Sequence, residues 1–191
     1  MARIAFVVGD DFEDSEFRTP YDGLAARGHQ IEVLGVKAGH IVLGKNGKEK
    51  VRIEKAVADA DARSYDALVI PGGYSPEHLR TDAGVIAFVV QMVRSHKLIA
   101  AICHGPLLLV TADAVHGRTM TSWPSVRREL TRAGARWVDQ EVVIDGQLIT
   151  SRTPADLEAF TRAIGQQLDA RPTTPFPPGP AASTATTAKR P

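Results

Sequence analysis

Residues 97–109 read K-L-I-A-A-I-C-H-G-P-L-L-L, and this stretch decides the fold. Its first part, Lys97–Ile102, is a short apolar run of the kind found in strands buried on both faces. Its last part, from Pro106, is an apolar segment that opens with proline, which is common in the first turn of a helix. The stretch therefore predicts a strand, a tight turn at Cys103 and a helix.

Similar short apolar runs occur three times before this stretch. Helical patterns separate the runs: Phe17, Tyr21 and Leu24 share one face of the first helix, which Gly28 closes. Strands that alternate with helices predict an α/β fold with a parallel sheet. The three earlier strands are expected at Arg3–Val8, Gln30–Val36 and Asp66–Pro71.

The rest of the chain adds two hairpins, a last helix and a tail. Residues 40–52 suggest a small hairpin outside the main sheet, and Asp145-Gly146 marks the turn of a second hairpin. The last helix is expected to open at Thr153-Pro154. From residue 171 the sequence is rich in Pro, Thr and Ala, so we expect one α/β domain over residues 1–170 and a mobile tail over 171–191.

Composition narrows the classes of partner and location. The 191 residues carry 23 Lys and Arg against 22 Asp and Glu, a net charge of +1, so neither nucleic acid nor an acidic membrane is an expected partner. No signal peptide or membrane span is recognisable, which predicts a cytoplasmic protein. A single cysteine cannot form an internal disulfide, so its thiol is either core packing or a reactive group.

Cys103 is the candidate nucleophile. It follows a strand at the carboxyl edge of the sheet, where ligands bind in open α/β folds, and Gly105 suits the tight turn of a nucleophile elbow. A following helix N-terminus would lower the pKa of the thiol. The alternative is an inert core cysteine, because free cysteines are often buried.

Two further segments reach the same edge of the sheet. Gly72 and Gly73 could present backbone N–H groups to a developing oxyanion, although they could equally form only a tight turn. Glu13 could hydrogen-bond the thiol and hold its proton. Its neighbouring acids compensate a helix N-terminus equally well, and spacing cannot separate Glu13 from Asp10, Asp11, Asp14 and Glu16.

His104 and Glu77 have no evident catalytic role within a single subunit. His104 follows Cys103 directly, so its side chain is expected to leave the turn in another direction and to be a poor base within one subunit. Glu77 lies at a predicted helix start, where dipole compensation would explain it.

Several segments together resemble the PfpI family of intracellular cysteine peptidases, within the wider superfamily of the Parkinson-linked protein deglycase and the class I glutamine amidotransferases. These segments are F-E-D near residue 13, Y-D-G-L-A-A-R-G-H, D-A-L-V-I-P-G-G-Y-S-P-E-H-L-R, A-I-C-H-G-P and A-G-A-R-W-V-D-Q-E-V-V-I-D-G-Q-L-I-T-S-R-T-P-A-D-L. The resemblance spans roughly residues 2–168.

The resemblance implies a flavodoxin-like three-layer sandwich with a mainly parallel sheet, Cys103 as the nucleophile and Glu13 as the carboxyl on its sulfur. It also implies that His104 pairs with Glu77 of a neighbouring subunit, and hence a symmetric dimer or a ring of dimers. Trp123 falls where relatives place a pocket residue, although a buried aromatic is equally expected there. Thr153 stands where relatives often carry histidine, so glutamine hydrolysis is not expected.

The same resemblance implies a cofactor-independent enzyme, with two activities for one thiolate. One is attack on an aldehyde such as methylglyoxal, or on early glycation adducts, to give a hydroxy acid such as lactate; the other is peptide hydrolysis through an acyl-enzyme. A compact pocket favours the first activity, which is that of a glyoxalase or deglycase in a stress response. The alternatives outside catalysis are a redox sensor or chaperone that uses Cys103 oxidation, and a receiver-like module suggested by Asp10 and Asp11.

Overall fold

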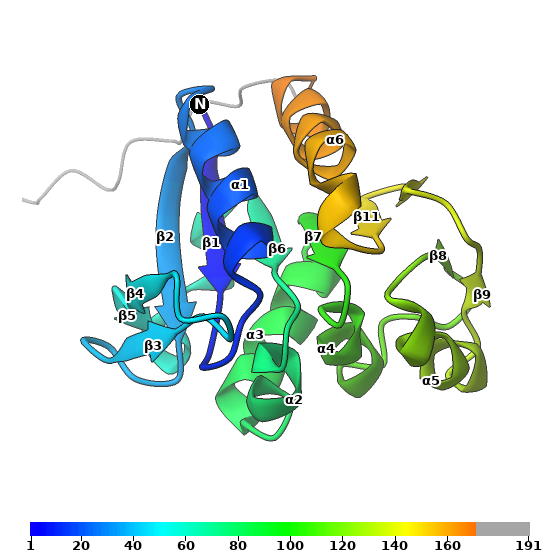
Figure 1. Cartoon of the computed structure of the whole chain (residues 1–191), viewed down its shortest axis with the longest axis horizontal. Coiled ribbons are helices and arrows are strands. Elements are labelled where there is room, and N and C mark those ends of the chain that lie inside the picture. The colour runs from blue at the N-terminus through cyan, green and yellow to red at the C-terminus, as the bar shows by residue number, and fades with distance from the viewer. Residues whose placement is uncertain (171–191) are drawn as a thin grey trace, which may run out of the picture.

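A seven-stranded sheet forms the centre of the molecule, with the strand order β10-β11-β7-β6-β1-β2-β5 (Figure 1). Every neighbouring pair is parallel except the β10–β11 hairpin. The coordinates are a computed structural model that describes residues 1–170, so the predicted mobile tail lies outside the described residues.

Strands and helices alternate along much of the chain. The strands are β1 (Arg3–Val7), β2 (Gln30–Gly35), β3 (Ile41–Leu43), β4 (Lys50–Arg52), β5 (Lys55–Ala56), β6 (Ala67–Ile70), β7 (Leu98–Ile102), β8 (Thr119–Met120), β9 (Arg136–Trp137), β10 (Val142–Asp145) and β11 (Leu148–Ser151). The α-helices are α1 (Asp14–Ala25), α2 (Ser75–Leu79), α3 (Ala83–Arg94), α4 (Pro106–Thr111), α5 (Arg127–Arg132) and α6 (Leu157–Asp169). Short 3-10 helices are η1 (Val57–Asp59), η2 (Ala62–Ser64), η3 (Pro124–Val126) and η4 (Pro154–Asp156).

Helices cover both faces of the sheet. On β1, Ile4 and Phe6 face a layer formed by α1 and α6, whereas Ala5 and Val7 face the layer that contains α3 and α4. The two helices of the first layer lie side by side (Figure 1). Because both faces are covered, β6 and β7 are apolar and buried along their whole length. This arrangement is the predicted three-layer α/β sandwich with a mainly parallel sheet.

Both predicted hairpins are present. β10 and β11 pair antiparallel around Gly146, whose φ of +60° is the left-handed conformation that glycine tolerates. β3 and β4 form a separate two-stranded sheet, as expected for residues 40–52. Within the described part of the chain, no helix is both long and apolar enough to cross a bilayer.

The β3–β4 hairpin is fixed to the start of α1 by a buried carboxylate. The backbone N–H groups of Asn46, Lys48 and Glu49 donate to Asp14, at 2.8–2.9 Å. Burial opposes ionisation of Asp14, but these donors outweigh it and hold the pKa of the carboxyl below its usual value of 3.8. The loop between β3 and β4 is therefore held beside the carboxyl end of β1.

Candidate active site

Cys103 occupies the sharp turn that the sequence predicts between β7 and α4. Its φ of +61° lies in the left-handed region, which costs a non-glycine residue on the order of 1–3 kcal/mol. Gly105 is required for the turn, because a Cβ at this position would lie 2.5 Å from the carbonyl oxygen of Ile70. The strained turn holds the thiol at the carboxyl edge of the sheet, with the residue only 6% exposed.

The Gly72-Gly73 turn after β6 lies directly against the nucleophile. A Cβ on Gly72 would be 2.7 Å from the Cβ of Cys103, so only glycine allows this approach. The backbone N–H groups of Gly73 and His104 donate toward the sulfur and favour its thiolate form. Only one of the two predicted glycine donors, the N–H of Gly73, therefore faces the sulfur. The N–H of Gly72 donates to Glu16 instead, at 2.8 Å.

Glu16 of α1 provides the carboxyl at the nucleophile. It is fully buried, and the thiol of Cys103 hydrogen-bonds to it. Burial is the main cause that raises the pKa of Glu16 to about 7. Oε1 has no hydrogen-bond partner among residues 1–170. A carboxyl with this pKa can take a proton from the thiol, or return one, at neutral pH.

Glu13 does not contact the sulfur, and the prediction that it does is wrong. Its Oε2 is 2.8 Å from Nζ of Lys45, and its Oε1 accepts a hydrogen bond from Ser15. The reason is helical geometry, because Glu13 occupies the N-cap position before α1, whereas Glu16 lies one turn further on, on the buried face with Phe17. An acid within the apolar stripe of the helix was the signal that could have identified Glu16.

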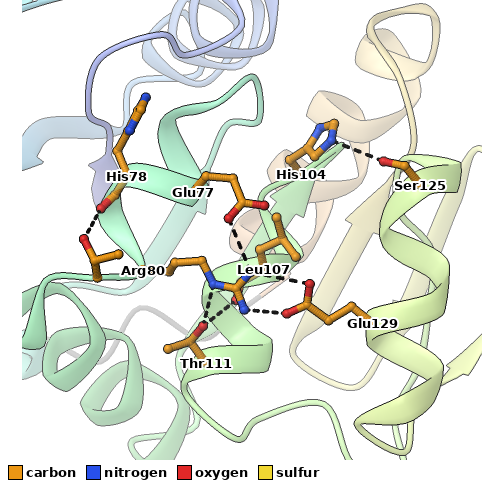
Figure 2. A network of polar contacts seen from close by, with 9 residues as sticks. Glu77, His78, Arg80, His104, Leu107, Thr111, Ser125 and Glu129 are labelled. Atoms are coloured by element: carbon orange, nitrogen blue, oxygen red, sulfur yellow. Dashed lines mark hydrogen bonds and ion pairs between the residues drawn. The ribbon is translucent and has the colours of Figure 1, made fainter.

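His104 contacts the sulfur within the same chain. Its Nδ1 is 3.3 Å from Sγ of Cys103, so the expectation that the ring turns away is wrong. Nε2 lies 3.4 Å from the hydroxyl of Ser125, as Figure 2 shows, and the ring stacks on Trp123. Burial lowers the pKa of His104, and the nearby charge of Glu77 partly offsets this effect. The ring is therefore a neutral donor or acceptor beside the sulfur at pH 7.

Glu77 belongs to a different network in the single chain. It accepts a hydrogen bond at 3.4 Å from Arg80, which also contacts Thr111 and Glu129 (Figure 2). No hydrogen bond joins Glu77 to His104 among the residues drawn in Figure 2. The pairing of these two residues across a subunit interface remains a prediction.

A pocket of about 380 Å³ opens onto Cys103. Trp123, 39% exposed, forms part of its wall, as expected for a pocket residue. Lys45, which sequence reasoning missed, reaches the pocket from the β3–β4 loop and forms an ion pair with Glu13. The lining residues are Glu16, Lys45, Gly73, Tyr74, Cys103, His104, Trp123 and Pro154.

The protonation of Cys103 differs from the expectation of a lowered pKa. Burial raises the pKa of the thiol above its usual value, and the negative charge of Glu16 raises it further. These effects outweigh the N–H donors, and α4 is only six residues long, so its dipole is small. The thiol and the Glu16 carboxyl therefore titrate as a coupled pair, in which a proton on Glu16 removes one obstacle to the thiolate.

Within residues 1–170, no group of three or more His, Cys, Asp or Glu side chains could hold a metal ion.

Comparison of the sequence with protein-family models gives a match to the DJ-1/PfpI family over residues 2–167. The chain belongs to the DJ-1/PfpI family. This confirms the family that the motifs around Cys103 predicted, and the match spans nearly all of the described domain.

Similar members of the DJ-1/PfpI family have different names. The chain is 44% identical to the protein/nucleic acid deglycase 2 of Escherichia coli (strain K12) over 161 residues, 84% of this chain and 94% of the relative. It is 44% identical, over the same shares of both chains, to YraA of Bacillus subtilis (strain 168), which is provisionally named a cysteine protease. The crystal structure of Drosophila melanogaster DJ-1beta superimposes with a TM-score of 0.82 at 27% identity, covering 89% of this chain and 91% of that one.

Proposed function

We propose that this protein is a Cys103-dependent enzyme that converts reactive aldehydes, or early aldehyde adducts, into hydroxy acids. The observation that carries the proposal is the buried Glu16 carboxyl, hydrogen-bonded to the thiol, with a pKa of about 7. A nucleophile and a proton carrier in contact are the two groups that addition to a carbonyl requires. The name of the deglycase relative supports the same chemistry.

For methylglyoxal the steps balance without an external oxidant. The sulfur of Cys103 adds to the aldehyde carbon, Glu16 takes the thiol proton, and the new alkoxide is protonated to give a hemithioacetal. Removal of the proton from that carbon and its return to the neighbouring carbon convert the hemithioacetal into a thioester of lactate. Water then cleaves the thioester, which releases lactate and restores the thiol. The net reaction adds one water to methylglyoxal.

The backbone donors act on the charge that develops in these steps. The N–H groups of Gly73 and His104 point toward the sulfur, so they also face the site at which a bound carbonyl would become an oxyanion. His104 Nδ1, 3.3 Å from the sulfur, is a second proton carrier. A pocket of about 380 Å³ favours a small substrate over an extended chain.

Peptide hydrolysis is the second candidate, because the same thiolate could form an acyl-enzyme and YraA carries a protease name. A redox sensor in which Glu16 stabilises an oxidised Cys103 is the third. The proposal also includes a cytoplasmic symmetric homo-oligomer in which Glu77 of a neighbouring subunit orients His104. In that case dissociation and loss of activity should coincide.

The test is methylglyoxal consumption and lactate formation by metal-free protein in buffer without added thiol. Cys103→Ala should reduce lactate formation to background, and Glu16→Gln should lower kcat at least 100-fold, the size expected for loss of a general acid–base group. Glu13→Gln is the matched control, because it removes a neighbouring carboxylate that does not contact the sulfur; kcat should change only a few-fold.

A fluorogenic peptide separates the remaining candidates. Cys103-dependent peptide cleavage without lactate formation would replace the proposal with a peptidase. Turnover of neither substrate, together with ready oxidation of Cys103, would replace it with a redox sensor.

A further inference from the structure

Ser125 contacts the side of the His104 ring that faces away from the sulfur. Its hydroxyl lies 3.4 Å from Nε2, as Figure 2 shows. The other ring nitrogen, Nδ1, lies 3.3 Å from Sγ of Cys103. Both nitrogens of the imidazole are thus engaged within one chain, one by the nucleophile and one by a solvent-exposed serine.

The segment that carries Ser125 is attached to the nucleophile turn. The N–H of Trp123 donates to the carbonyl oxygen of Cys103, at 3.0 Å, and the N–H of Val126 donates to the carbonyl oxygen of Trp123, also at 3.0 Å. The side chain of Val126 is buried, and the indole of Trp123 stacks on the His104 ring with an interplanar angle of 26°. The serine therefore lies between two anchored neighbours, and the ring lies between the sulfur and the serine.

Helix capping does not explain Ser125. A serine near a helix start commonly caps the helix by accepting a backbone N–H. The N-cap residue of η3 is Trp123 and that of α5 is Val126, and neither helix has a side-chain cap. Within residues 1–170, the contact with His104 is the one hydrogen bond of the Ser125 hydroxyl. The hydroxyl is therefore free to serve the imidazole.

The neighbours of the two nitrogens decide which of them carries the ring proton. Burial lowers the pKa of His104, so the ring is neutral at pH 7 and has a single N–H. The thiol of Cys103 donates its own proton to Glu16, and its sulfur, a weak acceptor, already faces the backbone donors. A serine hydroxyl oxygen is a better acceptor. A proton on Nε2, facing Ser125, is thus favoured, and it leaves the lone pair of Nδ1 beside the sulfur.

We propose that Ser125 is a positioning residue that accepts the Nε2–H of His104 and thereby holds Nδ1 as a base beside the sulfur. The inference rests on the proposed function and deepens it, because it names the group that moves the carbon-bound proton of the hemithioacetal. A hydroxyl that accepts from the far nitrogen fixes the tautomer and stabilises the cation that forms when the near nitrogen takes a proton.

The proton transfer balances within the bound adduct. Nδ1 takes the proton from the carbon attached to Sγ, and the electron pair of that C–H bond passes to the adjacent carbonyl to give an enediolate. The imidazolium donates to Ser125 through Nε2–H during this step. Nδ1 then returns the proton to the neighbouring carbon, while the hydroxyl proton passes from the first oxygen to the second. The resulting thioester of lactate has the same atoms as the hemithioacetal.

A carboxylate from a second subunit would favour the same tautomer. In the proposed oligomer, Glu77 of a neighbouring subunit would also accept the Nε2–H of His104. Ser125 makes its contact within one chain, so it orients the ring before any partner is bound. The two contacts therefore support each other, and the effect of Ser125 is measurable by itself.

The test is the tautomer of His104 in the full chain labelled with ¹⁵N-histidine, measured by long-range ¹H–¹⁵N correlation at pH 7.5. The parent chain should show a protonated Nε2 and an unprotonated Nδ1, and His104→Gln identifies these signals by their loss. Ser125→Ala should shift the tautomer ratio at least threefold toward Nδ1–H, whereas Ser125→Thr keeps the hydroxyl and should restore the parent pattern. Ser95→Ala removes an exposed serine at the end of α3 and is the matched control, which should also keep the parent pattern.

Kinetics measure the consequence for turnover. Ser125→Ala should lower kcat for methylglyoxal about tenfold and leave KM within about twofold, because the serine contacts the base and does not line the pocket. His104→Gln should lower kcat by about 100-fold or more, the size expected for loss of a base. Thermal melting of each variant accompanies the assay, since a purely structural serine would change the melting temperature and not the tautomer.

Three results would overturn the inference: a ring proton on Nδ1 in the parent chain, an unchanged tautomer in Ser125→Ala, or a changed tautomer with unchanged kcat in an active enzyme. The NMR measurement needs no turnover, so it is independent of the proposed activity. Absence of lactate formation by the parent chain, together with loss of the Nε2–H tautomer in Ser125→Ala, would refute the aldehyde chemistry and still support Ser125 as the residue that positions the ring.

Discussion

Replacing Glu16 with glutamine should stabilise the protein, and only at neutral to alkaline pH. The carboxyl is fully buried, and its pKa is raised from the usual 4.5 to about 7. The unfolded chain ionises this group near 4.5, so between pH 4.5 and 7 the folded state holds a proton that the unfolded state has lost. Folding stability contributed by this group is therefore present below pH 4.5 and is lost as the pH rises through about 7.

The size of the effect follows from the shift. A rise from 4.5 to about 7, at 1.36 kcal/mol for each pKa unit, corresponds to roughly 3 kcal/mol of lost stability above pH 7. Glutamine keeps an oxygen that can accept the N–H of Gly72 and carries no charge at any pH. We expect Glu16→Gln to match the parent chain within about 1 kcal/mol at pH 5 and to exceed it by up to about 3 kcal/mol at pH 8.5.

Urea unfolding of both chains at pH 5 and pH 8.5 measures these differences. Glu158→Gln is the control, because the side chain of Glu158 is 94% exposed and its removal should change the unfolding free energy little at either pH. Equal differences between Glu16→Gln and the parent chain at both pH values would refute the reasoning, since the carboxyl would then ionise without a burial penalty. Glu16→Gln should also lose enzymatic activity, so the same substitution should raise the unfolding free energy and lower kcat.

Three further predictions concern the elements around the sulfur. Asp14→Asn should lower the unfolding free energy by about 2 kcal/mol at pH 7, because three backbone N–H groups lose a carboxylate acceptor; urea unfolding should show a smaller loss near pH 3, where the lowered pKa of Asp14 is approached. Gly73→Ala should cost more stability than Gly28→Ala in thermal melts: both have positive φ, but a Cβ on Gly73 would lie 2.3 Å from a backbone oxygen and one on Gly28 meets nothing within 4 Å. Alkylation of Cys103 by iodoacetamide should keep accelerating above pH 8, and at pH 8 should be faster in Glu16→Gln; a rate that is already constant from pH 6 would contradict the raised thiol pKa.

The main strands could be predicted from the sequence because the strands at the centre of the sheet are apolar, β6 and β7 along their whole length and β1 after Arg3. β1, β6 and β7 therefore stood out as short continuous runs, and the structure moves each of their ends by at most one residue. The tight turn at Cys103 was also predictable, since the elbow depends on local residues such as Gly105. Interactions within one segment were thus visible in the sequence.

The parts of the site that were missed depend on side-chain direction or on distant segments. Glu13 and Glu16 both follow β1, and only the rotation of the first helical turn decides which one reaches the sulfur. Lys45 enters the pocket because a hairpin loop is bonded to Asp14, about thirty residues earlier in the chain. The pKa of Cys103 depends on burial and on Glu16, neither of which the spacing around the cysteine contains.

The balance of charge among the side chains of the Cys103 pocket explains how a buried thiol can still react. Lys45 is neutralised by Glu13, so little positive charge is left to stabilise a thiolate and a carboxylate together. Transfer of the thiol proton to Glu16, whose pKa is about 7, makes the sulfur the one anionic site, and the two backbone donors then favour that charge. When a neutral aldehyde adds, the charge moves from sulfur to oxygen, and the proton on Glu16 can follow it. The pocket thus carries one negative charge at each stage, which is why an uncharged carbonyl compound suits it better than a carboxylate substrate.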